Sequence, residues 1–154
     1  MSEIYRLLRA DKNPALALQR LDDFADAFPA SRLLSEAQLA RVEALVATSN
    51  YGEATRALEL VHPESNRLRR MVRVTRGELL VKQNACEQAM VEFDTVIAES
   101  VQDVFDERAL YGRASCRLES GDVAGARSDL ARYLERHPKG VRASNIKKQL
   151  QSSL

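Results

Sequence analysis

The sequence lacks tryptophan and has few of the residues from which metal centres and most active sites are built. Its 154 residues include 2 histidines, 2 cysteines and 6 glycines. Metal centres need several histidine, cysteine or carboxylate ligands at recurring spacings. The sequence also contains no HExxH, GxSxG or Walker glycine motif. We therefore expect a protein that has no metal ion and no cofactor, and that is not an enzyme.

The sequence also lacks long hydrophobic runs and a strong net charge. No apolar stretch approaches the roughly 18 residues that a membrane-spanning helix needs, and the first residues contain no apolar core of a signal peptide. The formal net charge is +1, so no overall field favours nucleic acid or anionic lipid. We expect no membrane span, no nucleic-acid partner and a cytoplasmic location, or a periplasmic one if Met1 replaces a signal or an anchor.

The two cysteines, Cys86 and Cys116, are too far apart in the sequence for the short spacing of a metal site. Two thiols also make no disulfide framework of the kind found in small secreted domains. Free cysteine is among the most buried residue types. The favoured interpretation is therefore two small buried residues, with a reactive thiol or a single disulfide as the alternatives.

What the sequence does contain favours an all-α fold. Alanine and leucine are abundant, whereas aromatic residues make up 5%. Alanine and leucine are good helix formers, and the β-branched and aromatic residues that favour strands are scarcer. A hydrophobic share of 45% with 29% charged residues is typical of a folded, soluble chain.

Four segments repeat one pattern, in which a small residue is followed by large apolar residues at +4 and +7. Successive segments are offset by 37, 35 and 37 residues. This spacing places the three side chains on one face of a helix. The pattern therefore predicts a repeated helix. Its four sets are Ala17/Leu21/Phe24, Ala54/Leu58/Val61, Ala89/Phe93/Val96 and Ala126/Leu130/Tyr133.

A preceding helix completes each of the last three repeats. Val42, Gly77 and Ala114 stand 12 residues before the small residue of their repeat. Turn and cap residues separate the two helices of these repeats, and in the first repeat the second helix opens with Asn13-Pro14. We predict helices near residues 2–11, 14–28, 32–48, 51–61, 65–83, 86–99, 106–119, 122–136 and 141–152. They form a single domain, 1–154, with repeats at about 1–29, 31–63, 65–100 and 106–138 and a capping helix at about 141–152.

Residues 110–138, LYGRASCRLESGDVAGARSDLARYLERHP, resemble a tetratricopeptide repeat. The resemblance extends over about residues 14–138 and implies a right-handed α-solenoid of antiparallel helix pairs. The long repeats are similar to those of bacterial envelope-associated members of the family. One departure is the aromatic position of the first helix, which is Leu45, Leu80 or Arg117 here. The matching family positions are Ala114, Gly121, Ala126, Leu130 and Pro138.

The resemblance implies a scaffold or adaptor that binds a segment of another protein in a concave groove lined by the first helices. The mixture of apolar and acidic residues in this groove favours an amphipathic helix or an extended apolar segment. The alternatives are a self-assembling structural unit, hence a homo-oligomer, or an accessory domain of a larger bacterial envelope complex. The groove positions are Leu39, Glu43, Val46, Val74, Glu78, Val81, Tyr111, Ser115 and Leu118.

Charge is distributed unevenly along the chain. Residues 65–82 carry six basic residues and one acidic residue, whereas residues 83–107 carry seven acidic residues and no basic one. The favoured interpretation is that adjacent antiparallel helices pair these opposite charges. The alternative is a basic stripe of Arg69, Arg73 and Arg76, spaced at i, i+4 and i+7, that binds an acidic partner.

Overall fold

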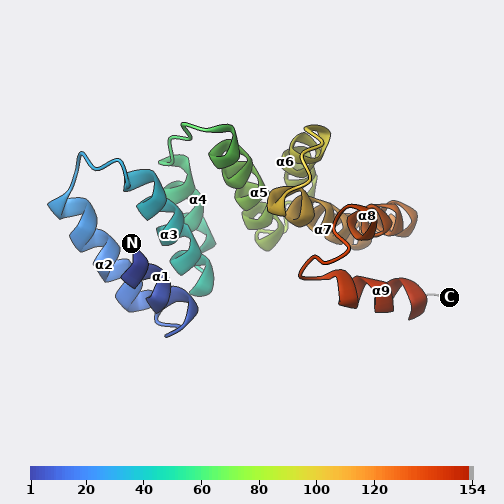
Figure 1. Ribbon diagram of the computed structural model, residues 1–154, viewed down its shortest axis with the longest axis horizontal. Coiled ribbons are helices and arrows are strands. Elements are labelled where there is room, and N and C mark those ends of the chain that lie inside the picture. Colours follow the sequence, from blue (N-terminus) through green and yellow to red (C-terminus); the bar gives the residue numbers. More distant parts are fainter. Residues whose placement is uncertain (153–154) are drawn as a thin grey trace. The chain divides into compact units, whose positions relative to one another are not determined.

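Helices alone make up the regular structure of residues 1–152, the part of the chain that the computed structural model describes (Figure 1). The chain divides into two compact units, Met1–Val72 and Arg73–Leu154. Each predicted helix is present, with ends within two residues of those expected, so the all-α prediction is confirmed. The helices are α1 (Ser2–Arg9), α2 (Pro14–Ala27), α3 (Leu34–Ala47), α4 (Tyr51–Glu59), α5 (Asn66–Lys82), α6 (Cys86–Ala98), α7 (Val104–Glu119), α8 (Val123–Arg136) and α9 (Ala143–Ser152).

Helices that are neighbours in the sequence pack together within each unit. In the first unit α2 packs on α1 and α3, and α3 packs on α4; in the second α7 packs on α6 and α8, and α8 packs on α9. The repeated pattern forms the packed face. Ala17, Ala54, Ala89 and Ala126 are all 0% exposed. A small side chain at this position lets the neighbouring helix approach closely, which explains why alanine recurs there.

The turn inside each repeat has one residue in the left-handed backbone conformation. These residues are Lys12, Ser49, Asn84 and Gly121, with φ of 49°, 61°, 58° and 84°. They are separated by 37, 35 and 37 residues, the same offsets as the side-chain pattern. In the last three turns, the residue that follows donates its amide N–H to a carbonyl five residues earlier, at 2.8 to 2.9 Å. The backbone therefore repeats in the register that the side chains predict.

The left-handed turns predict a stabilising substitution. Only glycine adopts a positive φ without steric cost, which is roughly 1–2 kcal/mol for other residues. Replacing Lys12 with glycine removes this cost, but part of the gain in stability is lost because glycine is more flexible in the unfolded chain. We expect Lys12→Gly to raise the free energy of unfolding by about 0.5 kcal/mol, measured by urea denaturation. Gly121→Ala is the matched reverse change and should lower it; a destabilised Lys12→Gly variant would contradict the prediction.

The ring of Phe93 is fully buried between two glycines on flanking helices. A Cβ atom at Gly77 of α5 would lie 2.5 Å from the ring, and one at Gly112 of α7 would lie 2.4 Å from it. Both distances are below any normal contact, so only a residue without a side chain fits on each side. The helix pair of the third repeat and the first helix of the fourth are therefore joined by one aromatic ring.

Cys86 and Cys116 form a disulfide, with Cα atoms 5.3 Å apart. The favoured expectation of two separate buried thiols is wrong, and the disulfide alternative is correct. Cys86 is the first residue of α6, and Cys116 lies in the last turn of α7. The two helices are antiparallel neighbours, so residues separated by 30 positions in the sequence meet at one end of the pair. The disulfide links the third repeat to the fourth.

Candidate protein-binding surfaces

The predicted groove residues of the first unit share one face of α3. Leu39, Glu43 and Val46 are all half-buried. The guanidinium of Arg9 on α1 donates two hydrogen bonds to the Glu43 carboxylate, each 3.1 Å long. Hydrogen bonding to Glu43 raises the pKa of Arg9. The same guanidinium lies over the ring of Tyr5, 4.7 Å from its centre. This face therefore presents apolar side chains around a paired charge.

The second unit repeats this arrangement on α5 and α7. Arg108 of α7 donates to both carboxylate oxygens of Glu78, at 2.9 and 2.6 Å, and to the hydroxyl of Thr75 at 3.2 Å. Val81, which lies on α5 with Glu78, is half-buried. Val74, in contrast, is 0% exposed, so it packs inside the unit and has no surface to offer a partner.

The remaining groove residues lie on α7. Tyr111 and Ser115 are half-buried, and Leu118 is 40% exposed. The Ser115 hydroxyl donates to the carbonyl of Tyr111 at 3.0 Å. The guanidinium of Arg142, just before α9, lies 4.4 Å from the centre of the Tyr111 ring. The surface of α7 thus presents an aromatic ring, which the cation of Arg142 contacts, and an apolar side chain.

Arginine side chains change the charge expected for these surfaces. The sequence predicts a groove of mixed apolar and acidic residues, but its two glutamates, Glu43 and Glu78, are each held by a two-point arginine contact. Arg9 and Arg108 were not among the predicted site residues. The sequence feature that could have indicated them is their position: each arginine lies about one repeat away from the glutamate with which it pairs, at separations of 34 and 30 residues. These two carboxylates therefore do not give the groove an unpaired negative charge.

The predicted basic stripe is largely engaged in ion pairs. Arg73 and Arg76 both donate to the carboxylate of Glu92 on α6, at 3.2 and 3.3 Å. Arg69, in the first unit, bonds to the side chain of Asn66 on its own helix. For Arg73 and Arg76 the structure favours pairing between adjacent antiparallel helices. A role of the stripe in binding a partner stays a prediction.

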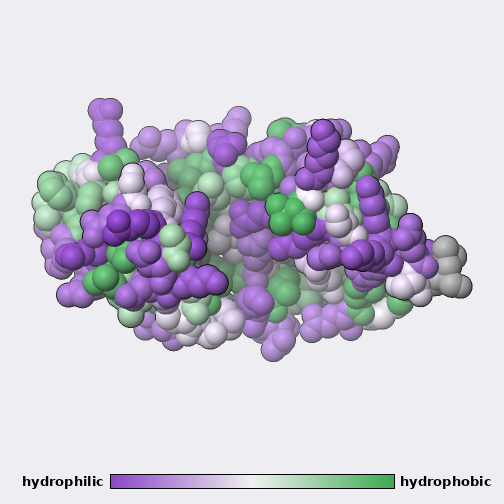
Figure 2. Space-filling model, turned by 60° about the horizontal axis from the view of Figure 1, so that its bottom comes forward, coloured by the Kyte–Doolittle hydropathy of each residue, from purple (hydrophilic) through white to green (hydrophobic). Residues whose placement is uncertain are grey.

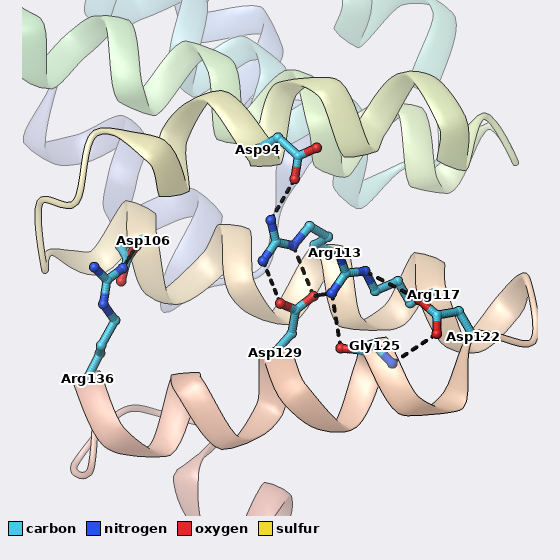
Figure 3. A network of polar contacts seen from close by, with 8 residues as sticks. All are labelled: Asp94, Asp106, Arg113, Arg117, Asp122, Gly125, Asp129 and Arg136. Carbon is cyan, nitrogen blue, oxygen red and sulfur yellow. Dashed lines mark hydrogen bonds and ion pairs between the residues drawn. The ribbon is translucent and has the colours of Figure 1, made fainter.

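A polar network joins α6, α7 and α8 in the second unit (Figure 3). Arg113 donates to both oxygens of Asp129, at 2.9 and 2.5 Å, and to Asp94 at 2.6 Å. Asp129 is 2% exposed. Burial lowers the pKa of Arg113, but its hydrogen bonds to Asp129 and Asp94 outweigh this and raise it overall. Arg113 is therefore held charged between two helices.

Arg117 extends this network along α7 toward the start of α8. Its guanidinium donates to Asp129 at 2.9 Å and to the carbonyl of Gly125 at 3.1 Å. Asp122, which caps α8, lies 3.7 Å from it. In Figure 3, Asp129 lies between Arg113 and Arg117. Charge-assisted hydrogen bonds thus join α7 to α8.

Comparison with known proteins identifies this region. Residues 108–140, which contain all of the network except Asp94, match the family model described as tetratricopeptide repeat. The chain carries a tetratricopeptide repeat. No curated protein and no solved structure matches it significantly. Tetratricopeptide repeats are typical of protein–protein interaction modules and are generally non-catalytic. The matched residues cover most of α7, all of α8 and the turn that follows α8.

The tetratricopeptide repeat is joined to α9 through a buried tyrosine. The Tyr133 hydroxyl donates to Glu107 and accepts a hydrogen bond from the backbone N–H of Arg142, at 3.0 Å. Glu107 also accepts from the N–H of Val141 at 2.9 Å. A Cβ at Gly140 would lie 2.6 Å from the tyrosine oxygen, so the turn needs glycine here. These bonds hold the start of the capping helix against the repeat.

Hydrogen bonds of Asp106 join α7 to the end of α8. This carboxylate is 0% exposed and accepts from Arg136 and from the ring of His137, both at 2.7 Å. His137 precedes the closing proline of the motif, and its side chain is largely buried. His137 is therefore a structural residue at the repeat end.

The tyrosine attachment predicts a pH-dependent contribution to stability. Burial and the hydrogen bond to Glu107 raise the pKa of Tyr133 from 10.0 to about 12. The folded state therefore holds this proton more tightly than the unfolded state does. The stabilisation is full below pH 10 and is lost as the pH rises toward 12. We expect Tyr133→Phe to cost roughly 1–3 kcal/mol at pH 7, and less at pH 11. Urea unfolding at both pH values measures this; an equal cost at both would contradict it.

The exposed surface offers separate apolar side chains. Figure 2 shows hydrophobic groups separated by hydrophilic ones on the face in view. Exposed apolar residues of the second unit include Leu118 at 40% and Val123 at 55%. A bilayer-spanning helix needs about 20 mostly apolar residues, and no helix within residues 1–152 meets that requirement.

Proposed function

We propose that the chain is a non-catalytic adaptor that binds a segment of a partner protein on the faces formed by its first helices. The tetratricopeptide repeat at residues 108–140 carries the proposal. Val81 on α5 and Tyr111 and Leu118 on α7 supply partly exposed apolar surface on these faces. The paired charge of Arg108 and Glu78 offers hydrogen bonds at its edge. Such a surface suits an amphipathic helix or an extended apolar segment.

A pair of matched variants tests this proposal. Leu118→Glu places a charge on the α7 face, whereas Val123→Glu places the same charge on an exposed residue of α8. We expect proteins captured by the wild-type chain at high salt to bind the Leu118→Glu variant about tenfold more weakly and the Val123→Glu variant unchanged. High salt is used because it screens exposed charge pairs but leaves apolar contacts. Equal retention by both variants would count against the proposed surface.

A second candidate is an accessory domain of a larger envelope-associated protein, and the disulfide favours it. Disulfides form and persist in oxidising compartments, including the bacterial periplasm, and are rare in the cytosol. Mass spectrometry of native material without reduction tests it. We expect the bridged Cys86–Cys116 peptide in an exported fraction. Recovery of both thiols free from the cytosol would contradict this location.

A further inference from the structure

The two sulfurs of the disulfide between Cys86 and Cys116 differ in their access to solvent. Cys116 on α7 is 0% exposed, so no reagent reaches its sulfur while the protein is folded. Cys86, the first residue of α6, is half-buried, and a carboxylate oxygen of Glu119 lies 3.1 Å from its sulfur. Because Glu119 is an exposed residue, this contact places the sulfur of Cys86 at the surface. Cys86 is therefore the end of the disulfide that is open to attack.

This difference fixes the direction of thiol–disulfide exchange. A thiolate opens a disulfide by attacking one sulfur, and the other sulfur leaves as a thiolate. Attack on Cys86 forms a mixed disulfide between Cys86 and the incoming thiol and breaks the bond to Cys116, whose sulfur keeps the electron pair and then takes a proton. When a second thiolate attacks the incoming sulfur, Cys86 is released as a thiolate. Two external thiols are then oxidised to one disulfide, and the disulfide of the protein is reduced to two thiols.

Cys116 is placed to reverse the first step. Burial disfavours the charged thiolate that has to leave, so opening through Cys86 is slow. The Cα atoms of the two cysteines are 5.3 Å apart on packed helices, so the released sulfur stays beside the mixed disulfide. Attack by Cys116 on the sulfur of Cys86 expels the external thiol and restores the original disulfide.

Glu119 determines which thiols react readily at this sulfur. Its carboxylate carries a negative charge at the point of attack, and the attacking thiolate is also negative. The two charges repel each other, and a second negative charge on the thiol increases the repulsion. A basic group beside the thiol reduces it. The surface around Cys86 therefore favours a thiol that has positively charged surroundings.

We propose that Cys86 is a thiol-exchange site, at which a thiol in basic surroundings opens the disulfide, and that buried Cys116 is the resolving thiol. Glu119 is a positioning residue that slows attack by anionic thiols. The exchange does not depend on whether a partner binds the first-helix faces, so the inference goes beyond the adaptor function proposed above.

Sulfite identifies the attacked sulfur, because it leaves a sulfonate on that sulfur and releases the other as a thiol. The oxidised full chain is treated with sulfite, quenched in acid, unfolded and alkylated, and its peptides are measured by mass spectrometry. We expect the sulfonate on Cys86 and the alkyl group on Cys116. In denaturant, where both sulfurs are accessible, each cysteine should carry the sulfonate in part of the chains. A sulfonate as frequent on Cys116 as on Cys86 in the folded protein would overturn the proposal.

A series of small thiols tests the role of Glu119. For each thiol, the rate of opening of the Glu119→Gln variant is divided by that of the wild type, so that the reactivity of the thiol itself cancels. We expect a ratio of about five for β-mercaptoethanol, because one unit charge at about 4 Å in water has an effect of that size. The ratio should be larger for mercaptoethanesulfonate, which has an additional negative charge. It should be near one for cysteamine, whose ammonium group offsets the charge of its thiolate.

Glu135→Gln is the matched control, because it removes the same charge from an exposed residue in the last turn of α8. Its rates should equal those of the wild type for every thiol. High salt should bring the ratios of the Glu119→Gln variant toward one, because salt screens charges at the surface. Ratios that are the same for all three thiols, or that salt does not lower, would overturn the assigned role of Glu119.

Discussion

Replacing Phe93 with alanine is expected to lower the free energy of unfolding by about 3–5 kcal/mol, the usual cost of removing a fully buried aromatic ring. The ring is 0% exposed and contacts the backbone at Gly77 and Gly112 on either side. Alanine would leave a cavity between α5 and α7, and neither glycine has a side chain with which to fill it. Guanidinium denaturation followed by circular dichroism measures the loss.

The glycines provide the control for this prediction. Gly112→Ala alone should cost roughly 1–3 kcal/mol, because its methyl group would overlap the ring. Combined with Phe93→Leu, which makes space, the same change should cost less than the sum of the two single variants. Strict additivity would show that the ring and the glycine do not share one packed site, and would contradict the account.

Reducing the disulfide between Cys86 and Cys116 should destabilise the second unit by roughly 3–4 kcal/mol, the chain-entropy value for a loop of about 30 residues. The sequence separation of the two cysteines is 30. The disulfide reduces the number of conformations open to the unfolded chain, so reducing it destabilises the protein mainly by raising the entropy of the unfolded state. Unfolding measured with and without dithiothreitol should reveal the difference.

The double variant Cys86→Ala and Cys116→Ala is the control for reduction. Its stability should not respond to dithiothreitol and should lie close to that of the reduced wild type. Thiol counting under denaturing, non-reducing conditions should find no free thiol in the wild type. Two free thiols, or a reduced protein as stable as the oxidised one, would contradict the predicted role of the bridge.

The groove residues show how far sequence reasoning reached at the candidate site. Leu39, Glu43 and Val46 share one face of α3, as helical spacing requires. Val74 has equivalent spacing but is fully buried, because burial depends on which helix lies against it. The charges of Glu43 and Glu78 were visible in the sequence, but their arginine partners come from the first helix of a neighbouring repeat. Periodicity along one helix carries no information about side chains that reach it from another.

The sequence by itself determined where the helices lie and which face of the second helix of each repeat is buried, because helical periodicity and turn chemistry are local. The alanine column and the left-handed turn residues keep the same offsets for this reason. Only the tertiary structure decided what meets across helices: the joining of Cys86 to Cys116 and the pairing of Arg117 with Asp129. Two helices can pack at different rotations and heights without any change in their own patterns. The scarcity of cysteine pointed to two isolated thiols, whereas packing placed them in contact.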